Sequence, residues 1–93
     1  MSASPAFQAA LGLAVAARRK QLGLTQEQLA IDSGIHQRYI SNVETGKRNP
    51  SYASLRRLAT SLGLDTSQLI AQAEQIEREG STDPAIAATS STA

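Results

Sequence analysis

The sequence predicts an all-α fold: one compact domain of five helices over residues 5–79, followed by a flexible tail over residues 80–93. Up to about Glu79, no stretch alternates apolar and polar residues as a half-buried strand does, and glycines instead recur at helix-length intervals. Hydrophobic residues make up 41% of the 93 residues and aromatic residues only 3%. The core must therefore consist of Leu, Ile, Val and Ala, which suits small, closely packed helices in a single domain.

The first helix is expected from Pro5 to about Gln21. Ser4 can cap it, proline is favoured at the first helical position, and the cations at residues 18–20 suit the negative end of the helix dipole. Gly23 can then end the helix. Its apolar face consists of Phe7, Leu11, Ala14 and Val15.

Two short helices follow, only about three residues apart. The first is expected over residues 26–33, after a capping-box pattern at residues 25–28. Gly34 can adopt the left-handed conformation that a tight turn requires. The second is expected from residue 36 or 37 to about residue 45. This spacing is typical of a helix-turn-helix, here at residues 25–45. The apolar residues that would join the pair to a common core are Leu29, Ile35, Ile40 and Val43.

After a basic loop at residues 47–50, two further helices are expected over about residues 52–62 and 66–79. Ser51 and Asp65 are suitable caps for them. The apolar stripe of the first is Leu55, Leu58, Ala59 and Leu62, and that of the second is Leu69, Ile70, Ala73 and Ile76. The tail that follows holds one charged residue and one large apolar residue, Ile86, so it cannot bury enough surface to offset the entropy of ordering.

Charge is divided along the chain, although the formal net charge is only +1. Residues 1–64 carry eight cations and three acids, whereas residues 65–93 carry one cation and five acids. Such a division suggests that the first part faces a polyanion, although a random scatter of surface charge can produce it too.

Composition excludes several kinds of site. Without cysteine there is no disulfide and no metal–thiolate centre, and the single histidine, His36, can neither build a metal cage nor form a relay with a second histidine. No glycine-rich phosphate loop or pair of catalytic carboxylates occurs. We therefore expect no enzyme activity, no metal and no cofactor. The sequence has neither a signal-peptide pattern nor a run of eighteen apolar residues, so we expect a cytoplasmic protein without membrane contact.

The outward face of the third expected helix is polar. It carries Gln37, Arg38, Ser41 and Asn42. In the major groove, Gln and Asn can pair with adenine, Arg with guanine, and Ser with either base. The motif and its outward face together predict contact with DNA.

The chain resembles the Cro/phage-repressor-type helix-turn-helix family, also called the xenobiotic-response-element family. The resemblance rests on LGLTQEQLA at residues 22–30, SGI at residues 33–35 and YISNVETGKRNPS at residues 39–51. It extends over about residues 11–70, because the flanking helices and the basic loop follow in order. It implies a lambda-repressor-like domain whose third helix enters the major groove.

The resemblance also implies roles for individual residues. Gln37, Arg38, Ser41 and Asn42 match base-reading positions. Contacts with the DNA backbone are implied for Thr25, Gln26, His36, Tyr39, Lys47, Arg48 and Asn49, although Tyr39 can equally pack against the protein. Arg19 and Glu44 match a structural ion pair. Ala16 departs from the pattern, since relatives often carry Arg there.

We expect a sequence-specific transcriptional regulator that binds double-stranded DNA as a homodimer on a palindromic operator. A single recognition helix contacts too few base pairs to specify one site in a genome, and a two-fold symmetric dimer doubles the number of base pairs that are read. We expect the fifth helix and the loop before it to form the dimer interface, through Leu64, Leu69, Ile70, Ala73 and Ile76. The acidic second part of the chain would then stay off the DNA.

Other functions remain open at this point. An antitoxin-type interaction module would bind a toxin and autoregulate its operon, although the tail offers only Ile86 as an anchor for wrapping. RNA binding is less favoured because exposed stacking aromatics are few. Within the family, a phage-type repressor, a restriction–modification controller and an antitoxin all fit. The run from His36 to Asn49 is similar to the controller group, although its residues recur in other branches of the family.

Overall fold

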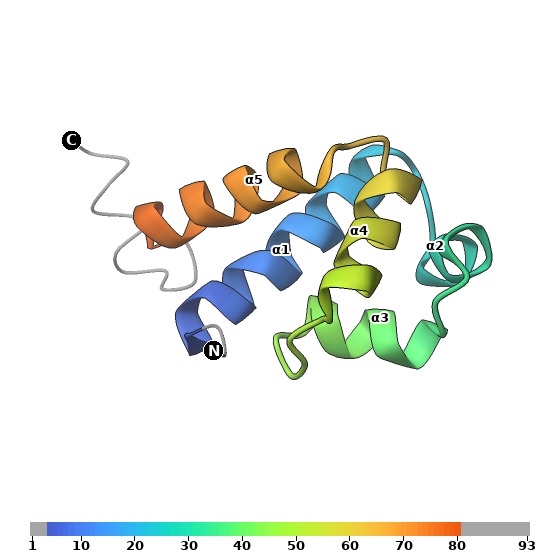
Figure 1. Ribbon diagram of the computed structural model, residues 1–93, viewed down its shortest axis with the longest axis horizontal. Helices are drawn as coiled ribbons and strands as arrows, with labels where there is room; N and C mark the ends of the chain where they lie inside the picture. The colour runs from blue at the N-terminus through green and yellow to red at the C-terminus, as the bar shows by residue number, and fades with distance from the viewer. Residues whose placement is uncertain (1–3, 81–93) are drawn as a thin grey trace.

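The computed structural model describes residues 4–80, and within them the fold is all-α (Figure 1). The helices are α1 (Pro5–Gln21), α2 (Gln26–Ser33), α3 (Gln37–Glu44), α4 (Tyr52–Ser61) and α5 (Thr66–Glu79). The predicted five-helix architecture is confirmed. The tail predicted for residues 80–93 lies, apart from Gly80, outside the described residues. Within residues 4–80, no helix combines the length and apolar character needed to span a lipid bilayer.

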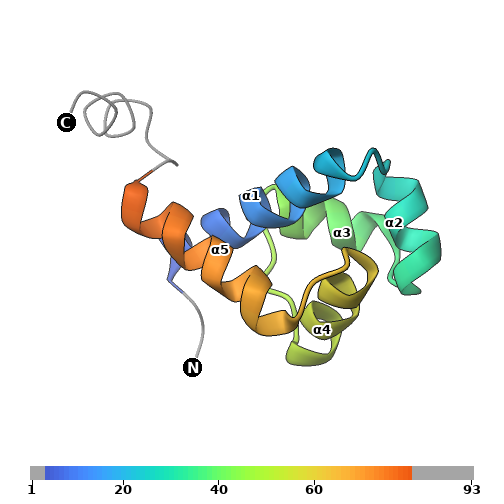
Figure 2. The same ribbon diagram turned by 90° about the horizontal axis from the view of Figure 1, so that it is seen from above.

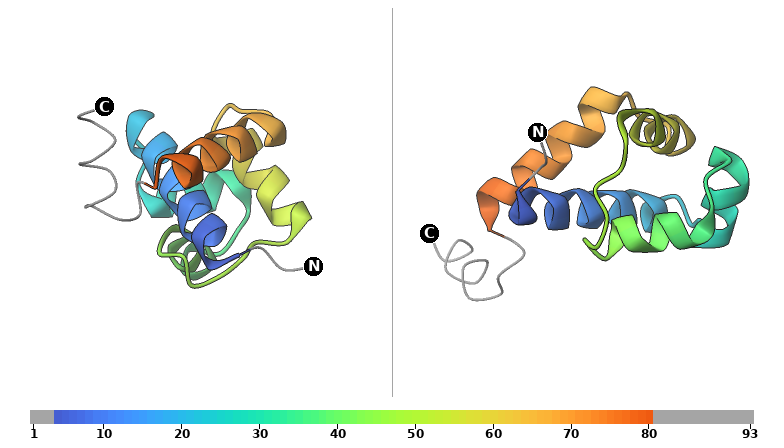
Figure 3. Two further views of the ribbon diagram at one scale, coloured as in Figure 1. Left: turned by 90° about the vertical axis from the view of Figure 1, so that its left-hand side faces the viewer. Right: turned by 60° about the horizontal axis from the view of Figure 1, so that its bottom comes forward.

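Helix α1 lies between α5 and α3, and α2 packs against α3 and α4 (Figures 2 and 3). Each of the five helices contributes fully buried side chains, and so does Leu62, which caps the C-terminal end of α4. The largest are Leu11, Val15, Leu29, Ile40, Val43, Leu58, Leu62 and Leu69. The core is therefore aliphatic, as the composition predicts, and it holds α3 against α1 through one face only.

The first helix of the helix-turn-helix, α2, begins and ends where its capping residues predict. At its start, the Thr25 side chain accepts a hydrogen bond from the backbone N–H of Gln28, and the Gln28 side chain accepts one from the backbone N–H of Thr25. After α2, Gly34 adopts a φ of 72°, which a side chain would disfavour. The chain can thus reverse and start α3 only three residues after α2 ends.

A glycine that the sequence does not mark as special sets the distance between α1 and α3. A Cβ atom on Gly12 would overlap the backbone carbonyl oxygen of Val43 and lie 2.7 Å from that of Glu44. The backbone of α1 therefore touches the C-terminal end of α3 directly. Any side chain at this position would push α3 outward.

The structure corrects part of the predicted dimer interface. Leu69 and Ala73 have no exposed surface, because they pack into the core of their own chain. In this conformation they are not accessible to a partner. Leu64, Ile70 and Ile76 are only partly buried and pack at the edge of the core.

Candidate nucleic-acid interface

Helix α3 has one face in the core and one directed to solvent. Ile40 and Val43 are fully buried. On the other side, Gln37 and Arg38 are exposed, and Ser41 and Asn42 are partly buried. Within residues 4–80, none of the side chains of Gln37, Arg38, Ser41 and Asn42 forms a hydrogen bond or an ion pair with another residue. The predicted base-reading positions thus form one polar surface whose hydrogen-bonding groups have no partner in the protein.

The single histidine caps α3. His36 Nδ1 accepts a hydrogen bond of 3.1 Å from the backbone N–H of Arg38. A ring nitrogen that accepts a hydrogen bond carries no hydrogen, so the hydrogen of the neutral imidazole lies on Nε2. Because His36 is exposed, this second nitrogen is available as a donor next to the polar face of α3.

Tyr39 connects α3 to the basic loop and to α4. Its hydroxyl accepts a hydrogen bond of 3.0 Å from the backbone N–H of Ser51, and the Arg48 guanidinium lies 4.4 Å from the centre of its ring. Partial burial acts to raise the pKa of Tyr39, but hydrogen bonds involving Ser54, Ser51 and Arg48 outweigh it and leave the pKa below its ordinary value. Tyr39 therefore packs against the protein, and its hydroxyl accepts a hydrogen bond from the start of α4.

Hydrogen bonds to α3 and α1 hold the start of the basic loop in place. The backbone N–H groups of Lys47 and Arg48 both donate to the carbonyl oxygen of Asn42, at 2.9 and 3.1 Å. Gln8 Nε2 of α1 donates to the carbonyl oxygen of Gly46 at 2.8 Å. Sequence reasoning missed the role of Gln8, whose only signal in the sequence is a polar residue in an otherwise apolar stretch.

Several predicted contact residues lie around one open hollow of about 360 Å³. It is lined by His36, Arg38, Tyr39, Asn42 and Arg48. Two base-reading and three backbone-contact candidates therefore lie together. Lys47 and Asn49 are exposed on the adjoining loop, while Gln37 and Ser41 lie along α3 outside the hollow.

A nearly buried ion pair joins α1 to the end of α3, and its carboxylate also binds the start of α2. Arg19 Nε and Nη2 donate to the two carboxylate oxygens of Glu44 at 2.7 and 2.9 Å, and the two side chains are only 11% and 5% exposed. The hydrogen bonds and charge of Glu44 raise the pKa of Arg19 against the opposing effect of burial. Gln26 Nε2 donates to the same carboxylate at 3.0 Å. The predicted ion pair is thus present, and Gln26 has a protein partner that the sequence did not indicate.

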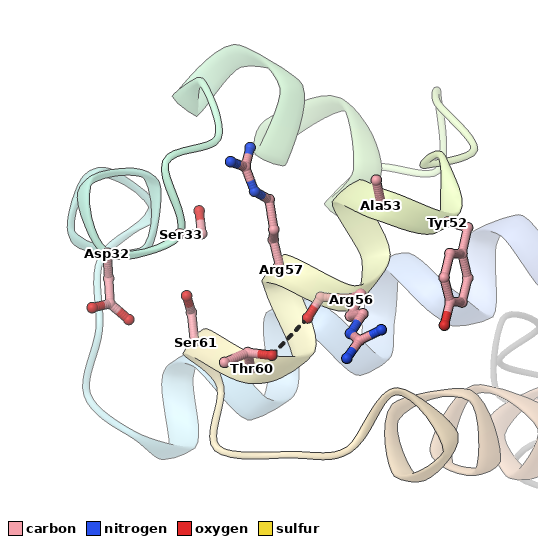
Figure 4. A pocket seen from close by; sticks show the side chains of 8 residues that line it. All are labelled: Asp32, Ser33, Tyr52, Ala53, Arg56, Arg57, Thr60 and Ser61. Atoms are coloured by element: carbon pink, nitrogen blue, oxygen red, sulfur yellow. Dashed lines mark hydrogen bonds between the residues drawn. The ribbon is translucent and has the colours of Figure 1, made fainter.

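A second hollow, of about 520 Å³, lies between α2 and α4 (Figure 4). Asp32 lies on its α2 side, and Tyr52, Arg56 and Arg57 lie on its α4 side. No residue with a predicted DNA contact lines it. The two hollows therefore share no lining residue, and only the smaller one adjoins the polar face of α3.

Comparison with known proteins agrees with this geometry. A helix-turn-helix family model matches residues 15–69. An uncharacterized HTH-type transcriptional regulator of Sinorhizobium fredii, y4dJ, is 39% identical over 57 residues, which cover 61% of this chain and 74% of the relative. Control protein C.MunI of a Mycoplasma species is 33% identical over 58 residues, covering 62% of this chain and 78% of the relative.

A solved structure is similar as well. The restriction-modification controller protein C.AhdI of Aeromonas hydrophila superposes with a TM-score of 0.65 at 35% identity, covering 67% of this chain and 94% of that chain. The match to the family model spans more than half of the chain, and its residues include the whole helix-turn-helix, the basic loop and α4. This chain therefore belongs to the helix-turn-helix family of DNA-binding transcriptional regulators.

Proposed function

We propose that this chain is a sequence-specific regulator, not an enzyme, that binds a palindromic DNA operator as a homodimer with α3 in the major groove of each half-site. The observation that carries the proposal is the polar face of α3, whose four outward side chains have no protein partner within residues 4–80. Groups of this kind on a helix are suited to base edges. Gln37, Arg38, Ser41 and Asn42 are its proposed base readers.

The same proposal assigns backbone contacts to the residues that flank α3. Lys47, Arg48 and Asn49 are exposed beyond its C-terminal end, and His36 lies at its N-terminal end. Thr25 is exposed at the start of α2, where two backbone N–H groups remain outside the capping box and favour an anion. Phosphate contacts at these points would fix the register in which α3 reads the bases.

Selection of bound sequences from a pool of random duplexes tests this proposal. We expect an inverted repeat whose half-sites are about 34 Å apart, or one helical turn. The double variant Gln37→Ala/Arg38→Ala should fold but lose the enrichment, because the removed side chains read bases. Enrichment of no sequence by the unaltered chain would contradict the proposal.

Three of the similar proteins are named control or controller proteins, whereas others are named repressors, one of them the immunity repressor of Bacillus phage phi105. We propose the controller role for this chain because the match covers 94% of the controller protein C.AhdI but only 48% of the phage repressor. A controller that regulates its own expression requires an operator near its own gene. The selected palindrome should then occur upstream of the coding sequence of this chain, and its absence there would contradict the controller role alone.

A further inference from the structure

One arginine of the smaller hollow is oriented before any ligand arrives. The Arg48 guanidinium lies over the Tyr39 ring at 4.4 Å, within the range of a cation–π interaction. Its backbone N–H is bonded to Asn42, as is that of Lys47. The side chain of Lys47, in contrast, has no contact of this kind in the described part of the chain. Arg48 therefore has less conformational entropy to lose on binding than its neighbour.

Tyr39 itself is held from two sides. Its ring packs against the core from α3, and its hydroxyl accepts the N–H of Ser51, the residue that caps α4. Against the opposing effect of partial burial, hydrogen bonds involving Ser54, Ser51 and Arg48 lower the pKa of Tyr39. The hydroxyl oxygen thus joins the loop to α4.

We propose that Tyr39 is a positioning residue, which holds Arg48 so that the guanidinium binds one DNA phosphate in the hollow, opposite the Nε2–H of His36. A guanidinium offers paired N–H groups that match two phosphate oxygens, and stacking on the ring fixes the plane of that fork. Both Arg48 and His36 line the hollow of about 360 Å³. This inference rests on the proposed function and changes the role of Tyr39 from phosphate ligand to support.

A double-mutant cycle on the selected palindrome tests whether Tyr39 acts through Arg48. We expect Tyr39→Leu to weaken binding about fivefold, because the ring stack is lost, and Tyr39→Phe to retain most of the affinity. Arg48→Ala should weaken binding about tenfold, and the double variant Tyr39→Leu/Arg48→Ala no further. Tyr52→Leu is the matched control: Tyr52 is 69% exposed on α4, and its replacement should leave affinity unchanged.

A duplex with a single phosphate replaced by an uncharged methylphosphonate identifies the ligand. At the phosphate that Arg48 binds, this replacement should weaken binding by the unaltered chain and abolish the difference between that chain and Tyr39→Leu. A merely structural role of Tyr39 would leave the same deficit on both duplexes. Arg48→Lys provides a second route if Tyr39→Leu does not fold: it keeps the charge, loses the planar stack and should match the fivefold loss.

Two results would overturn the inference. One is a Tyr39→Leu deficit that persists in the Arg48→Ala background, and the other is a Tyr39→Phe variant as weak as Tyr39→Leu. A chain that binds DNA but gives additive effects would contradict this inference only. A chain that binds no duplex would contradict the proposed function and this inference with it.

Discussion

At the scale of single residues, we expect Glu44 to contribute more to stability than the exposed glutamates do, because its side chain joins three helices. Its carboxylate accepts from Arg19 of α1 and Gln26 of α2 while itself ending α3. We expect Glu44→Ala to lower the free energy of unfolding by about 3–5 kcal/mol, since Arg19 would be left nearly buried without a counter-ion. Thermal or urea unfolding measures the loss.

The matched control for this prediction is Glu74→Ala. Glu74 is exposed on α5 and is not paired within the described residues, so its replacement should change stability by no more than about 0.5 kcal/mol. Equal melting temperatures for the two variants would show that the ion pair adds nothing to stability.

Replacing a base reader and replacing a phosphate binder should both weaken DNA binding, but the loss of affinity should depend differently on the DNA sequence and on the salt concentration. Arg38→Ala should cost about 1–3 kcal/mol of binding and relax specificity at one base pair. Lys47→Ala should weaken binding to every duplex alike and reduce the slope of log affinity against log salt by about one. Affinities of both variants for the selected palindrome and its single-base derivatives, at several salt concentrations, test this division. Two variants that weakened all duplexes equally would contradict it.

The sequence indicated the residue types at the site but not their partners. The Arg19–Glu44 pair followed from the family resemblance, since it recurs at matching positions. The bond from Gln26 to Glu44 did not, because a glutamine at the start of a helix is equally suited to a phosphate and to a carboxylate. For Tyr39, both packing and phosphate contact were open, and the sequence does not indicate the hydrogen bond from the Ser51 N–H that supports packing.

At the scale of elements, the close approach of α1 to α3 depends on Gly12. Ala is favoured over Gly within a helix by about 1 kcal/mol, so Gly12→Ala would stabilise an isolated helix. In the folded chain, however, the added methyl would meet two backbone carbonyls that cannot move independently of α3. We expect a net loss of about 1–3 kcal/mol in the free energy of unfolding.

Displacement of α3 should also affect binding. Gly12→Ala should therefore weaken DNA binding even where the variant remains folded, a combination that chemical denaturation and DNA titration can measure together. Ala17→Gly, at an exposed position of α1, is the control: it should cost about 1 kcal/mol of stability and leave DNA affinity unchanged. A Gly12→Ala variant as stable as the unaltered chain would show that α1 and α3 can separate without cost.

Helix bounds were predictable because capping residues are local signals. The starts of four helices match a Ser, Thr or Asp cap that the sequence predicts, whereas α3 is capped by His36, which the sequence did not indicate. The contact face of α5 was not predictable in full, because an apolar stripe shows which face is covered but not by what. Leu69 and Ala73 belong to that stripe, and they are covered by the same chain.

At the scale of the whole molecule, the division of charge has a spatial counterpart. The exposed cations Arg38, Lys47 and Arg48 lie on and just after α3, whereas the exposed acids Glu74 and Glu77 lie on α5. Helix α1 separates these two helices (Figure 3). The acidic helix therefore lies away from the polar face of α3, so it can contact a partner without bringing negative charge to that face.

Dimerisation is the prediction that belongs to this scale. An eight-residue helix such as α3 is only about 12 Å long, so reading two half-sites about 34 Å apart requires two copies. With Leu69 and Ala73 excluded, Leu64 and Ile70 are the partly buried residues proposed for the contact between copies, together with Ile76. A carboxylate at Ile70 would be desolvated in such an interface without a counter-ion.

We therefore expect Ile70→Glu to weaken self-association at least tenfold in analytical ultracentrifugation, and to weaken binding to the full palindrome while leaving the intrinsic affinity for a half-site unchanged. Gln72→Glu adds the same charge at an exposed position of α5 and should leave both the dimer and its DNA binding intact. Melting temperatures measured in parallel separate loss of the interface from loss of the fold, because Ile70 also touches the core. If the unaltered chain were a monomer at concentrations that saturate the palindrome, or if Ile70→Glu dimerised as well as Gln72→Glu, α5 would not be the interface.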